Sequence, residues 1–411
     1  MSFSVSDILR RTARSRPGAR TFAALAVSIS GIVAAGYLLL FAASFSPEEK
    51  LRQNITAAHS RGFFSENYPQ YFYLRPLFGR LDMYTECVGI GIAVRPNDLL
   101  RMPTFGDCPG LTKAVGNNFA APSYDYMRYS HGHQIFLKPL YAFFSLETTR
   151  AITALTTFVL LLALFFVLKF RLDTAYAAVV ALSFFFTSSP SMFFTVTHGV
   201  AFWLVLAGAI TATLRDGKTA PLCLFGCIGA CDAFLNFFVM CSLSLALPLL
   251  CYVLAQWAKG EASDQVIANA FWGCVGWSIG FVAPWLIKWA MLMIVYSPTR
   301  EQLFGVTLDA YPSGGFLMIL TALGKNFLSA NWPMILIAFA LCARHKHRFS
   351  LKIPDGLWVV CLPALVPLFW ICILPGHSGI KHSAIVNIIL WPGLAAICLL
   401  LLSMPRPKAP G

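Results

Sequence analysis

Residues 151–168 read AITALTTFVLLLALFFVL, a run without a charged side chain that is followed directly by Lys169 and Arg171. An apolar run of this length approaches the ~20 residues that an α-helix needs to cross the hydrocarbon core of a bilayer. Basic residues just after such a run are typical of its cytoplasmic end. We therefore expect a transmembrane helix here.

The whole chain has the composition of a membrane protein. Of its 411 residues, 57% are hydrophobic and 12% are charged, and the mean hydropathy is +0.67. A soluble domain would carry about 25% charged residues. The net charge of +13 does not indicate nucleic-acid binding, because no basic face or binding motif accompanies it. Retention of basic residues near lipid phosphates explains the charge better, so we expect membrane lipids as partners.

Similar apolar runs occur along the rest of the chain. The first, residues 21–44, follows a basic tail (residues 1–20) and is too long for a signal-peptide core, so we read it as a retained helix. Nine further spans are expected near 151–168, 174–190, 199–214, 220–237, 238–257, 267–292, 328–343, 356–374 and 385–403. The pattern predicts an all-α polytopic membrane protein with about ten transmembrane helices.

The basic residues also predict an orientation. They cluster on the connections that share a side with the amino terminus, which places both termini in the cytoplasm. The bundle then spans residues 151–403, and a short cytoplasmic tail covers residues 404–411. We expect the protein in a bacterial inner membrane.

Residues 45–150 form a long polar loop that is expected outside the membrane as a subdomain with juxtamembrane helices. Most of the cysteines fall in or beside apolar segments, but Cys87 and Cys108 both lie in this loop. An oxidising compartment would allow them to pair. The sequence leaves a disulfide and two free thiols equally open, because the geometry cannot be read from it.

Two acids of this loop, Asp82 and Glu86, are four residues apart in LDMYTECVG. On a helix they would share one face. A carboxylate near the bilayer surface can act as a general base on a hydroxyl or hold a divalent cation such as Mg or Mn. Tyr84 lies between them as a candidate substrate contact. Spacing alone favours a solvated helix face with two ordinary acids. The position of the pair, shortly after the first span and before the apolar VGIGIAV, favours a site close to the bilayer surface. The sequence leaves open whether a metal is needed.

The segment YDYMRYSHGHQIFLKP, residues 124–139, is dense in Tyr, His, Arg and Lys. It contains four candidates for hydrogen bonds to a sugar or a phosphate: Arg128, His131, His133 and Lys138. A metal site would need more ligands than the two histidines. An interfacial belt of anchoring side chains is an equally good alternative.

Basic residues of the late external connections form a third group. Such residues can bind a phosphate through charge-assisted hydrogen bonds. The alternative is that their long side chains extend towards lipid headgroups, for which fewer residues would suffice. Their number favours a phosphate site. The group consists of Lys288, Arg300, Lys325, His377, Lys381 and His382.

One acid, Asp232, lies inside an apolar span with Asn236 one turn further on. An acid within a span is a functional candidate by default, here for proton or ion coupling. A capped residue that faces the protein interior is the alternative, and the sequence does not separate the two.

The layout resembles the GT-C class of membrane glycosyltransferases. The resemblance rests on the cytoplasmic amino end, the large first external loop with acids, and GIKHSAIVNIILWPGLAAI (residues 379–397), which looks like the basic, Pro-containing approach to a late helix in that class. In addition, RYSHGHQIFLKPLYAFF (residues 128–144) is similar to uncharacterised bacterial multi-pass proteins. The adjacent pair of acids usual in the GT-C class is absent.

This resemblance implies a polyprenyl-phosphate-linked sugar as donor and a glycan, lipid or protein acceptor on the external face. It implies Asp82 first, and Glu86 second, as the base or metal ligand. The absence of a P-loop suits a lipid-linked donor. A transporter or flippase for a lipid-linked or anionic solute, coupled through Asp232, is the alternative, and a non-catalytic scaffold is a third. The position of the essential acid distinguishes them.

Overall fold

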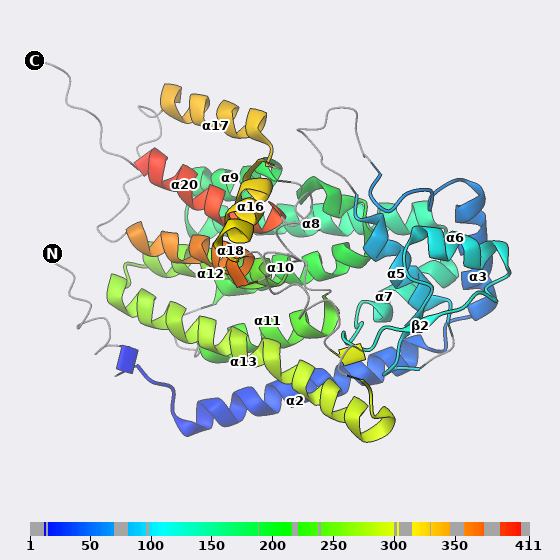
Figure 1. The fold of residues 1–411 in the computed structure, drawn as a ribbon. Coiled ribbons are helices and arrows are strands. Elements are labelled where there is room, and N and C mark those ends of the chain that lie inside the picture. The colour runs from blue at the N-terminus through cyan, green and yellow to red at the C-terminus, as the bar shows by residue number, and fades with distance from the viewer. Residues whose placement is uncertain are drawn as a thin grey trace, which may run out of the picture.

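The computed structural model describes residues 12–13, 15–69, 81–95, 98–187, 189–215, 221–236, 240–299, 302–303, 315–328, 330–345, 357–373 and 387–403. These residues form a bundle of helices with a smaller helical unit at one end (Figure 1). The only strands among them are β1 (Pro103–Thr104) and β2 (Tyr124–Asp125), which pair antiparallel. The predicted all-α class is therefore confirmed.

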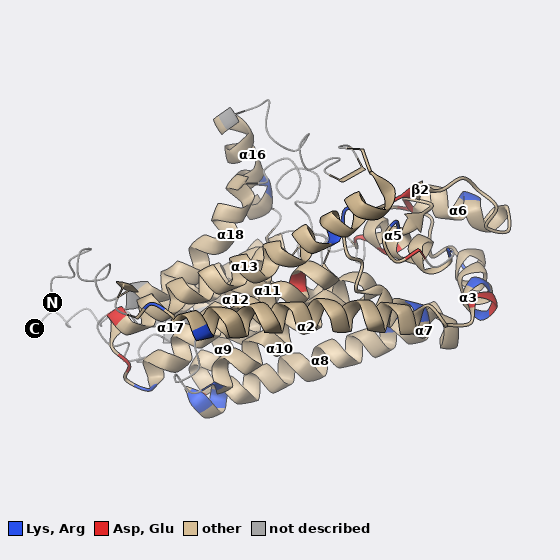
Figure 2. Cartoon of the chain, turned by 90° about the horizontal axis from the view of Figure 1, so that it is seen from below, with Lys and Arg blue, Asp and Glu red and all other residues tan. Residues whose placement is uncertain are grey.

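Five helices of the described residues are long and apolar enough to cross a membrane. They are α2 (Ala19–Ala43), α8 (Leu146–Arg171), α10 (Val196–Leu214), α12 (Cys241–Ala258) and α13 (Ser263–Tyr296). Four of them have 18 to 26 residues, close to the ~20 that a span needs, and α13, with 34 residues, is longer than a span requires. Charged side chains gather at the two ends of the bundle, and few occur between them (Figure 2). These features indicate an integral membrane protein.

The other predicted spans are helical where they were expected, but shorter. They are α9 (Thr174–Leu182) with η1 (Ser183–Phe186), α11 (Pro221–Leu235), α17 (Trp332–His345), η3 (Leu357–Val360) with α18 (Cys361–Ile373), and η5 (Asn387–Leu390) with α20 (Trp391–Ser403). An additional helix, α16 (Gly315–Leu328), precedes α17. Ten spans therefore remain a prediction.

Helices α11 and α13 touch backbone to backbone through glycines. A Cβ atom on Gly280 would stand 1.9 Å from the carbonyl oxygen of Gly226, and one on Gly276 would stand 2.1 Å from that of Leu222. Gly276 and Gly280 form the small-xxx-small pattern that lets membrane helices approach closely. Any side chain at these positions would force the two helices apart.

The described residues between 44 and 145 form what we call the polar subdomain. Its helices are α3 (Glu48–Ser60), α5 (Met83–Ala93), α6 (Cys108–Gly116) and α7 (Gln134–Phe143). They bury a hydrophobic core that includes Ile55, Leu111 and Tyr141 and continues onto Val196 and Val200 at the start of α10. The unit therefore sits directly on the end of the bundle.

A disulfide between Cys87 and Cys108 joins α5 to α6. Of the two alternatives that the sequence left open, the structure has the bonded one. Both cysteines are completely buried. The bond holds α5, which follows Asp82 and carries Glu86, against the neighbouring helix of the subdomain.

Candidate functional site

Asp82 ends the loop before α5 and caps that helix. Its Oδ1 accepts a hydrogen bond from the backbone N–H of Thr85 at 3.0 Å, and its Oδ2 accepts one from the Thr85 hydroxyl at 2.6 Å. Aspartate is among the preferred capping residues because it satisfies an amide of the first turn. Nε2 of His198, in the first turn of α10, lies 2.8 Å from the same Oδ2. Asp82 and His198 are both 1% exposed, so they form a buried pair.

Glu86 lies one turn further along α5 and is also buried. Its Oε1 accepts a hydrogen bond from the hydroxyl of Tyr141 on α7. Its Oε2 accepts one from the backbone N–H of Thr197 on α10, at 2.9 Å. The two acids therefore do not form a solvated helix face. They are fixed where α5, α7 and α10 meet.

His131 and His133 extend this buried polar region towards α13. Their ring centroids are 5.6 Å apart. Burial lowers the pKa of His133 to about 3, although its hydrogen bond to the backbone of Leu235 opposes this shift. Burial, followed by the positive charge of Lys288, lowers the pKa of His131 well below its usual value. Both imidazoles are therefore neutral at physiological pH. In the described part of the chain, no three His, Cys, Asp or Glu side chains are grouped so that they could hold a metal ion.

The backbone around these histidines is tightly constrained. His131 has a positive φ of 56°, a conformation that non-glycine residues rarely adopt. Gly132 donates a hydrogen bond to the carbonyl oxygen of Phe234 at 2.8 Å. A Cβ on Gly132 would stand 2.3 Å from the Phe234 ring. The glycine of the H-G-H sequence is therefore needed for the close approach to α11.

Arg128, Tyr129, His131 and Lys288 form a second group, which we call the Tyr129 cluster. The buried ammonium of Lys288, on α13, donates a hydrogen bond to the carbonyl oxygen of Tyr129. The guanidinium of Arg128 lies 5.1 Å from the ring centroid of Tyr126 and 5.8 Å from that of Tyr129. Neither cation forms an ion pair with a carboxylate of the described residues. The structure thus brings together residues that the sequence analysis placed in separate groups.

An aromatic ladder on α13 leads from the Tyr129 cluster into the bundle. Tyr129 contacts Trp285 edge-on with 5.4 Å between ring centroids, and Trp285 is followed by Phe281 at 6.3 Å. Phe281 then stacks on Trp277 at 4.7 Å. Below the cluster, the ladder borders an apolar groove of about 700 Å³ between α12, α13 and α18, where Trp370 forms part of the opposite wall. A row of ring contacts therefore leads from the groove to the cations.

Tyr84 lies half-buried on α5 and stacks on Tyr68 with 6.3 Å between ring centroids. Burial raises the pKa of Tyr84; the carboxylates of Asp107 and Asp82 add to this effect, and the charge of Arg128 opposes it. Tyr84 is thus within electrostatic reach of both Asp82 and Arg128. It is the predicted residue that links the acid pair to the Tyr129 cluster.

Two further predicted residues, Lys138 and Lys325, lie on helices of the described chain. Lys138 is buried on α7, and burial lowers its pKa to about 8, although the charge of Glu48 opposes this shift. Lys325 is exposed on α16, a helix that packs on α18. The other predicted basic residues lie outside the described residues; they are Arg300, His377, Lys381 and His382.

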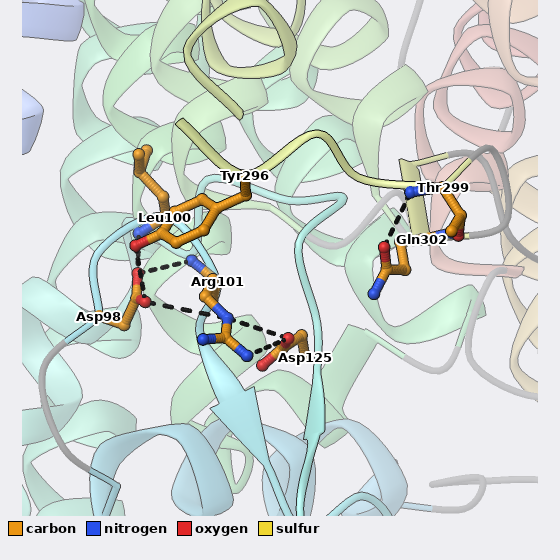
Figure 3. A network of polar contacts seen from close by, with 7 residues as sticks. All are labelled: Asp98, Leu100, Arg101, Asp125, Tyr296, Thr299 and Gln302. Carbon is orange, nitrogen blue, oxygen red and sulfur yellow. Dashed lines mark hydrogen bonds and ion pairs between the residues drawn. The ribbon is translucent and has the colours of Figure 1, made fainter. Parts of the chain in front are cut away.

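The carboxyl end of α13 is fastened to the polar subdomain by a polar network (Figure 3). The hydroxyl of Tyr296 donates to Oδ2 of Asp98 at 3.0 Å. Two nitrogens of Arg101 donate to Oδ2 of Asp125, at 3.0 and 2.7 Å. The network holds the carboxyl end of α13, the helix that carries Lys288, against the subdomain.

Sequence reasoning missed His198 and Tyr129 as members of the site. His198 was assigned to the short connection before a span, where a lone histidine carries no chemical signal. Its position in the first turn of an apolar helix is the one feature that could have drawn attention to it. Tyr129 contributes its backbone carbonyl oxygen and its ring. Neither role produces a motif that could be recognised in the sequence.

No protein-family model, no curated protein and no solved structure matches this chain.

Proposed function

We propose that the protein is a glycosyltransferase that moves a sugar from a polyprenyl-phosphate-linked donor to an acceptor hydroxyl outside the membrane. The observation that carries this proposal is the Tyr129 cluster, in which Lys288 and Arg128 lie at the end of an aromatic ladder that borders an apolar groove. An amphiphile with an anionic head and a long apolar chain matches both parts of this surface.

The phosphate would bind at the cations of the cluster. Lys288 has only a backbone carbonyl as hydrogen-bond partner among the described residues, and an ammonium can donate three hydrogen bonds. Charge-assisted hydrogen bonds from an ammonium and a guanidinium to phosphate oxygens are roughly twice as strong as neutral ones. The same cations would stabilise the negative charge that develops on the leaving polyprenyl phosphate.

The isoprenoid chain would follow the aromatic ladder into the groove. The groove is lined almost entirely by apolar side chains, such as Leu249, Phe281 and Trp370. Exposed hydrophobic side chains on α13, among them Val282 and Leu286, face the region where lipid would surround the bundle. The apolar chain would thus stay in a hydrocarbon environment while its head reaches the polar subdomain.

The acid–base role in this proposal belongs to Asp82, with His198 as its partner. The acceptor hydroxyl loses its proton to this pair as its oxygen bonds to the anomeric carbon. The bond from that carbon to the phosphate oxygen breaks, and polyprenyl phosphate leaves with the electron pair. Glu86, held by Tyr141 and Thr197, keeps α5 in place. This assignment orients the polar subdomain outwards, with both termini in the cytoplasm of a bacterial inner membrane.

A transporter or flippase for a lipid-linked or anionic solute is the second candidate. Asp232 favours it, because its carboxylate is completely buried within the apolar helix α11 and accepts a hydrogen bond from Asn236 at 3.0 Å. Buried acids within spans often couple ion movement to transport. In this case Asp232, rather than Asp82, would be essential.

The experiment compares Asp82→Asn, Asp232→Asn and the exposed control Glu49→Gln in proteoliposomes. The readout is transfer of label from polyprenyl-phosphate-linked sugars to endogenous glycan acceptors, with folding checked by gel filtration. We expect Asp82→Asn to reduce transfer at least 100-fold and the other two variants to stay within threefold of wild type. No transfer by the wild type, together with loss of the cellular phenotype in Asp232→Asn alone, would replace the enzyme with the transporter.

A further inference from the structure

A polar cavity, separate from the apolar groove, lies beside the Tyr129 cluster at the carboxyl end of α13. Its volume is about 400 Å³, within the range of about 300–1,000 Å³ that is usual for small-molecule sites. The residues that matter for its chemistry are Tyr124, Asp125, Tyr126, Arg128, Thr299 and Gln302. Two parts of the chain that are far apart in sequence therefore meet here: β2 with the turn after it, and the segment that follows α13.

Two tyrosines give the cavity flat aromatic surfaces. The rings of Tyr124 and Tyr126 are 6.2 Å apart and stand at 72° to each other. Tyr124 is 46% exposed, and its ring packs against Gly106, where a Cβ would stand 3.0 Å from it. Aromatic faces are electron-rich and attract the weakly positive C–H groups of a sugar ring. Rings at a corner can contact two sides of one pyranose or furanose.

The cavity also offers one hydrogen-bond acceptor and one donor that the described residues leave unused. Both bonds from Arg101 end on Oδ2 of Asp125, and no described residue donates to Oδ1. Gln302 bonds Thr299 through its Oε1 and its backbone N–H. Its Nε2 donates to no described residue and points away from Thr299 (Figure 3). A carboxylate oxygen and an amide N–H are suited to sugar hydroxyls, which both donate and accept.

Arg128, which belongs to the Tyr129 cluster, also lines this cavity and gives it a positive charge. It lies over the Tyr126 and Tyr129 rings and has no carboxylate partner in the described ranges. A guanidinium binds phosphate oxygens in a fixed two-pronged geometry. The cavity therefore has hydroxyl-binding groups at one end and a phosphate-binding group at the other.

We propose that this cavity binds the sugar ring of a sugar 1-phosphate unit, with the ring between Tyr124, Asp125 and Gln302 and the phosphate on Arg128. The inference rests on the proposed function, because the unit is the head of the lipid-linked donor. It assigns donor recognition to Asp125 and Gln302, which the sequence analysis did not select. The isoprenoid chain would then leave the phosphate along the ladder that begins at Trp285.

The test uses the purified full chain and soluble probes. Titration calorimetry measures a panel of hexose and pentose 1-phosphates against inorganic phosphate and methyl glycosides of the same sugars. We expect at least one sugar 1-phosphate to bind tenfold or more tightly than both inorganic phosphate and its methyl glycoside. Arg128→Gln should weaken the binding of both this sugar 1-phosphate and inorganic phosphate at least tenfold.

Variants at the sugar end separate ring recognition from charge. Tyr124→Ala and Gln302→Ala should weaken the binding of the sugar 1-phosphate at least fivefold and leave the binding of inorganic phosphate unchanged. Tyr176→Ala and Gln53→Ala, which remove the same residue types from α9 and α3, should change neither. The inference fails if no sugar 1-phosphate outperforms inorganic phosphate, or if the sugar-end variants have no effect.

The outcome also distinguishes this cavity from the proposed reaction. If the protein binds a sugar 1-phosphate selectively but transfers no sugar, the cavity remains a sugar 1-phosphate site and the proposed glycosyltransferase reaction is rejected. If the rate of sugar transfer in Tyr124→Ala and Gln302→Ala stays within twofold of wild type, the proposal of a glycosyltransferase stands. The proposal that this cavity is the donor site is then rejected.

Discussion

His198 Nε2 lies 2.8 Å from Asp82 Oδ2, although the two residues are 116 positions apart in the chain. The contact joins the start of α5 in the polar subdomain to the start of α10 in the bundle. Both side chains are buried, so this contact helps to compensate each of them for the loss of water, together with the hydrogen bonds from Thr85 to Asp82.

We predict that removing one partner of this pair is strongly destabilising. Removing one partner of a buried ion pair typically costs about 3–5 kcal/mol, because the other charge is left without compensation. His198→Ala should lower the free energy of unfolding by that order, measured by denaturant titration in detergent. His59→Ala, at a half-buried position of α3, is the control and should change it by less than about 0.5 kcal/mol.

A double-mutant cycle tests whether the two residues act together. Asp82→Asn combined with His198→Ala should cost clearly less than the sum of the single variants, because residues in direct contact are not additive. If the two costs simply add, the pair contributes no coupling and the contact is incidental.

We predict that Lys288→Met separates function from folding. The ammonium of Lys288 is buried and bonds only a backbone carbonyl among the described residues, so an apolar replacement of similar length should not lower thermal stability. Transfer from the lipid-linked donor should fall at least tenfold, because a phosphate partner is lost. Lys113→Met, exposed on α6, is the matched control. A folded Lys288→Met protein with normal transfer would remove Lys288 from the phosphate site.

We predict that Gly132→Ala destabilises the junction between the polar subdomain and α11. The new methyl group would stand 2.3 Å from the Phe234 ring and 2.6 Å from the Phe234 carbonyl oxygen. The carbonyl belongs to the backbone, which cannot move aside as the end of a flexible side chain can. Overpacking of this kind typically costs about 1–3 kcal/mol. Gly116→Ala, at the end of α6 with open space around it, should be neutral or slightly stabilising. Equal melting temperatures for the two variants would contradict the close approach.

We predict that acid destabilises the fold through His133. Its pKa is about 3 in the folded protein, because burial disfavours the charged ring, and about 6.5 in the unfolded chain. Between these values the unfolded state binds a proton that the folded state does not. The free energy of unfolding should therefore fall as the pH drops below about 6.5, by up to about 1.4 kcal/mol per pH unit for this group.

The measurement for that prediction is denaturant unfolding at several pH values between 7 and about 4. His133→Gln should show a shallower dependence than wild type, and His59→Gln should keep the wild-type slope. His131 remains in both variants, and its lowered pKa should preserve part of the dependence. An unchanged slope in His133→Gln would show that this ring is not the group responsible.

The helical fold was largely predictable because long apolar runs decide it. The run predicted at 267–292 is α13 (Ser263–Tyr296), and the first predicted helix is α2. The local role of Asp82 was less accessible: it was expected on a helix face with Glu86, whereas it caps the helix before the first turn. Capping and helix-face positions differ by one residue at a helix boundary, where sequence reasoning is weakest.

The site itself required tertiary contacts that no local pattern contains. Arg128 and Lys288 were both selected from the sequence, but only the approach of α13 to the turn at Tyr129 places them together. His198 was missed for the same reason, because its chemistry depends on Asp82 across the junction of two units. The disulfide was an open alternative until the approach of α5 and α6 was known.

The glycine contact between α11 and α13 has a kinetic consequence for any long-chain ligand. Two helices in backbone contact cannot separate without losing that contact, so the α13 side of the groove behaves as a fixed wall. The other walls, α12 and α18, have no such glycine contact with α13 in the described residues, so a long-chain ligand that enters from the bilayer would have to displace one of them. Loading rates should then depend on lateral pressure in the membrane, while the affinity of the head group should not.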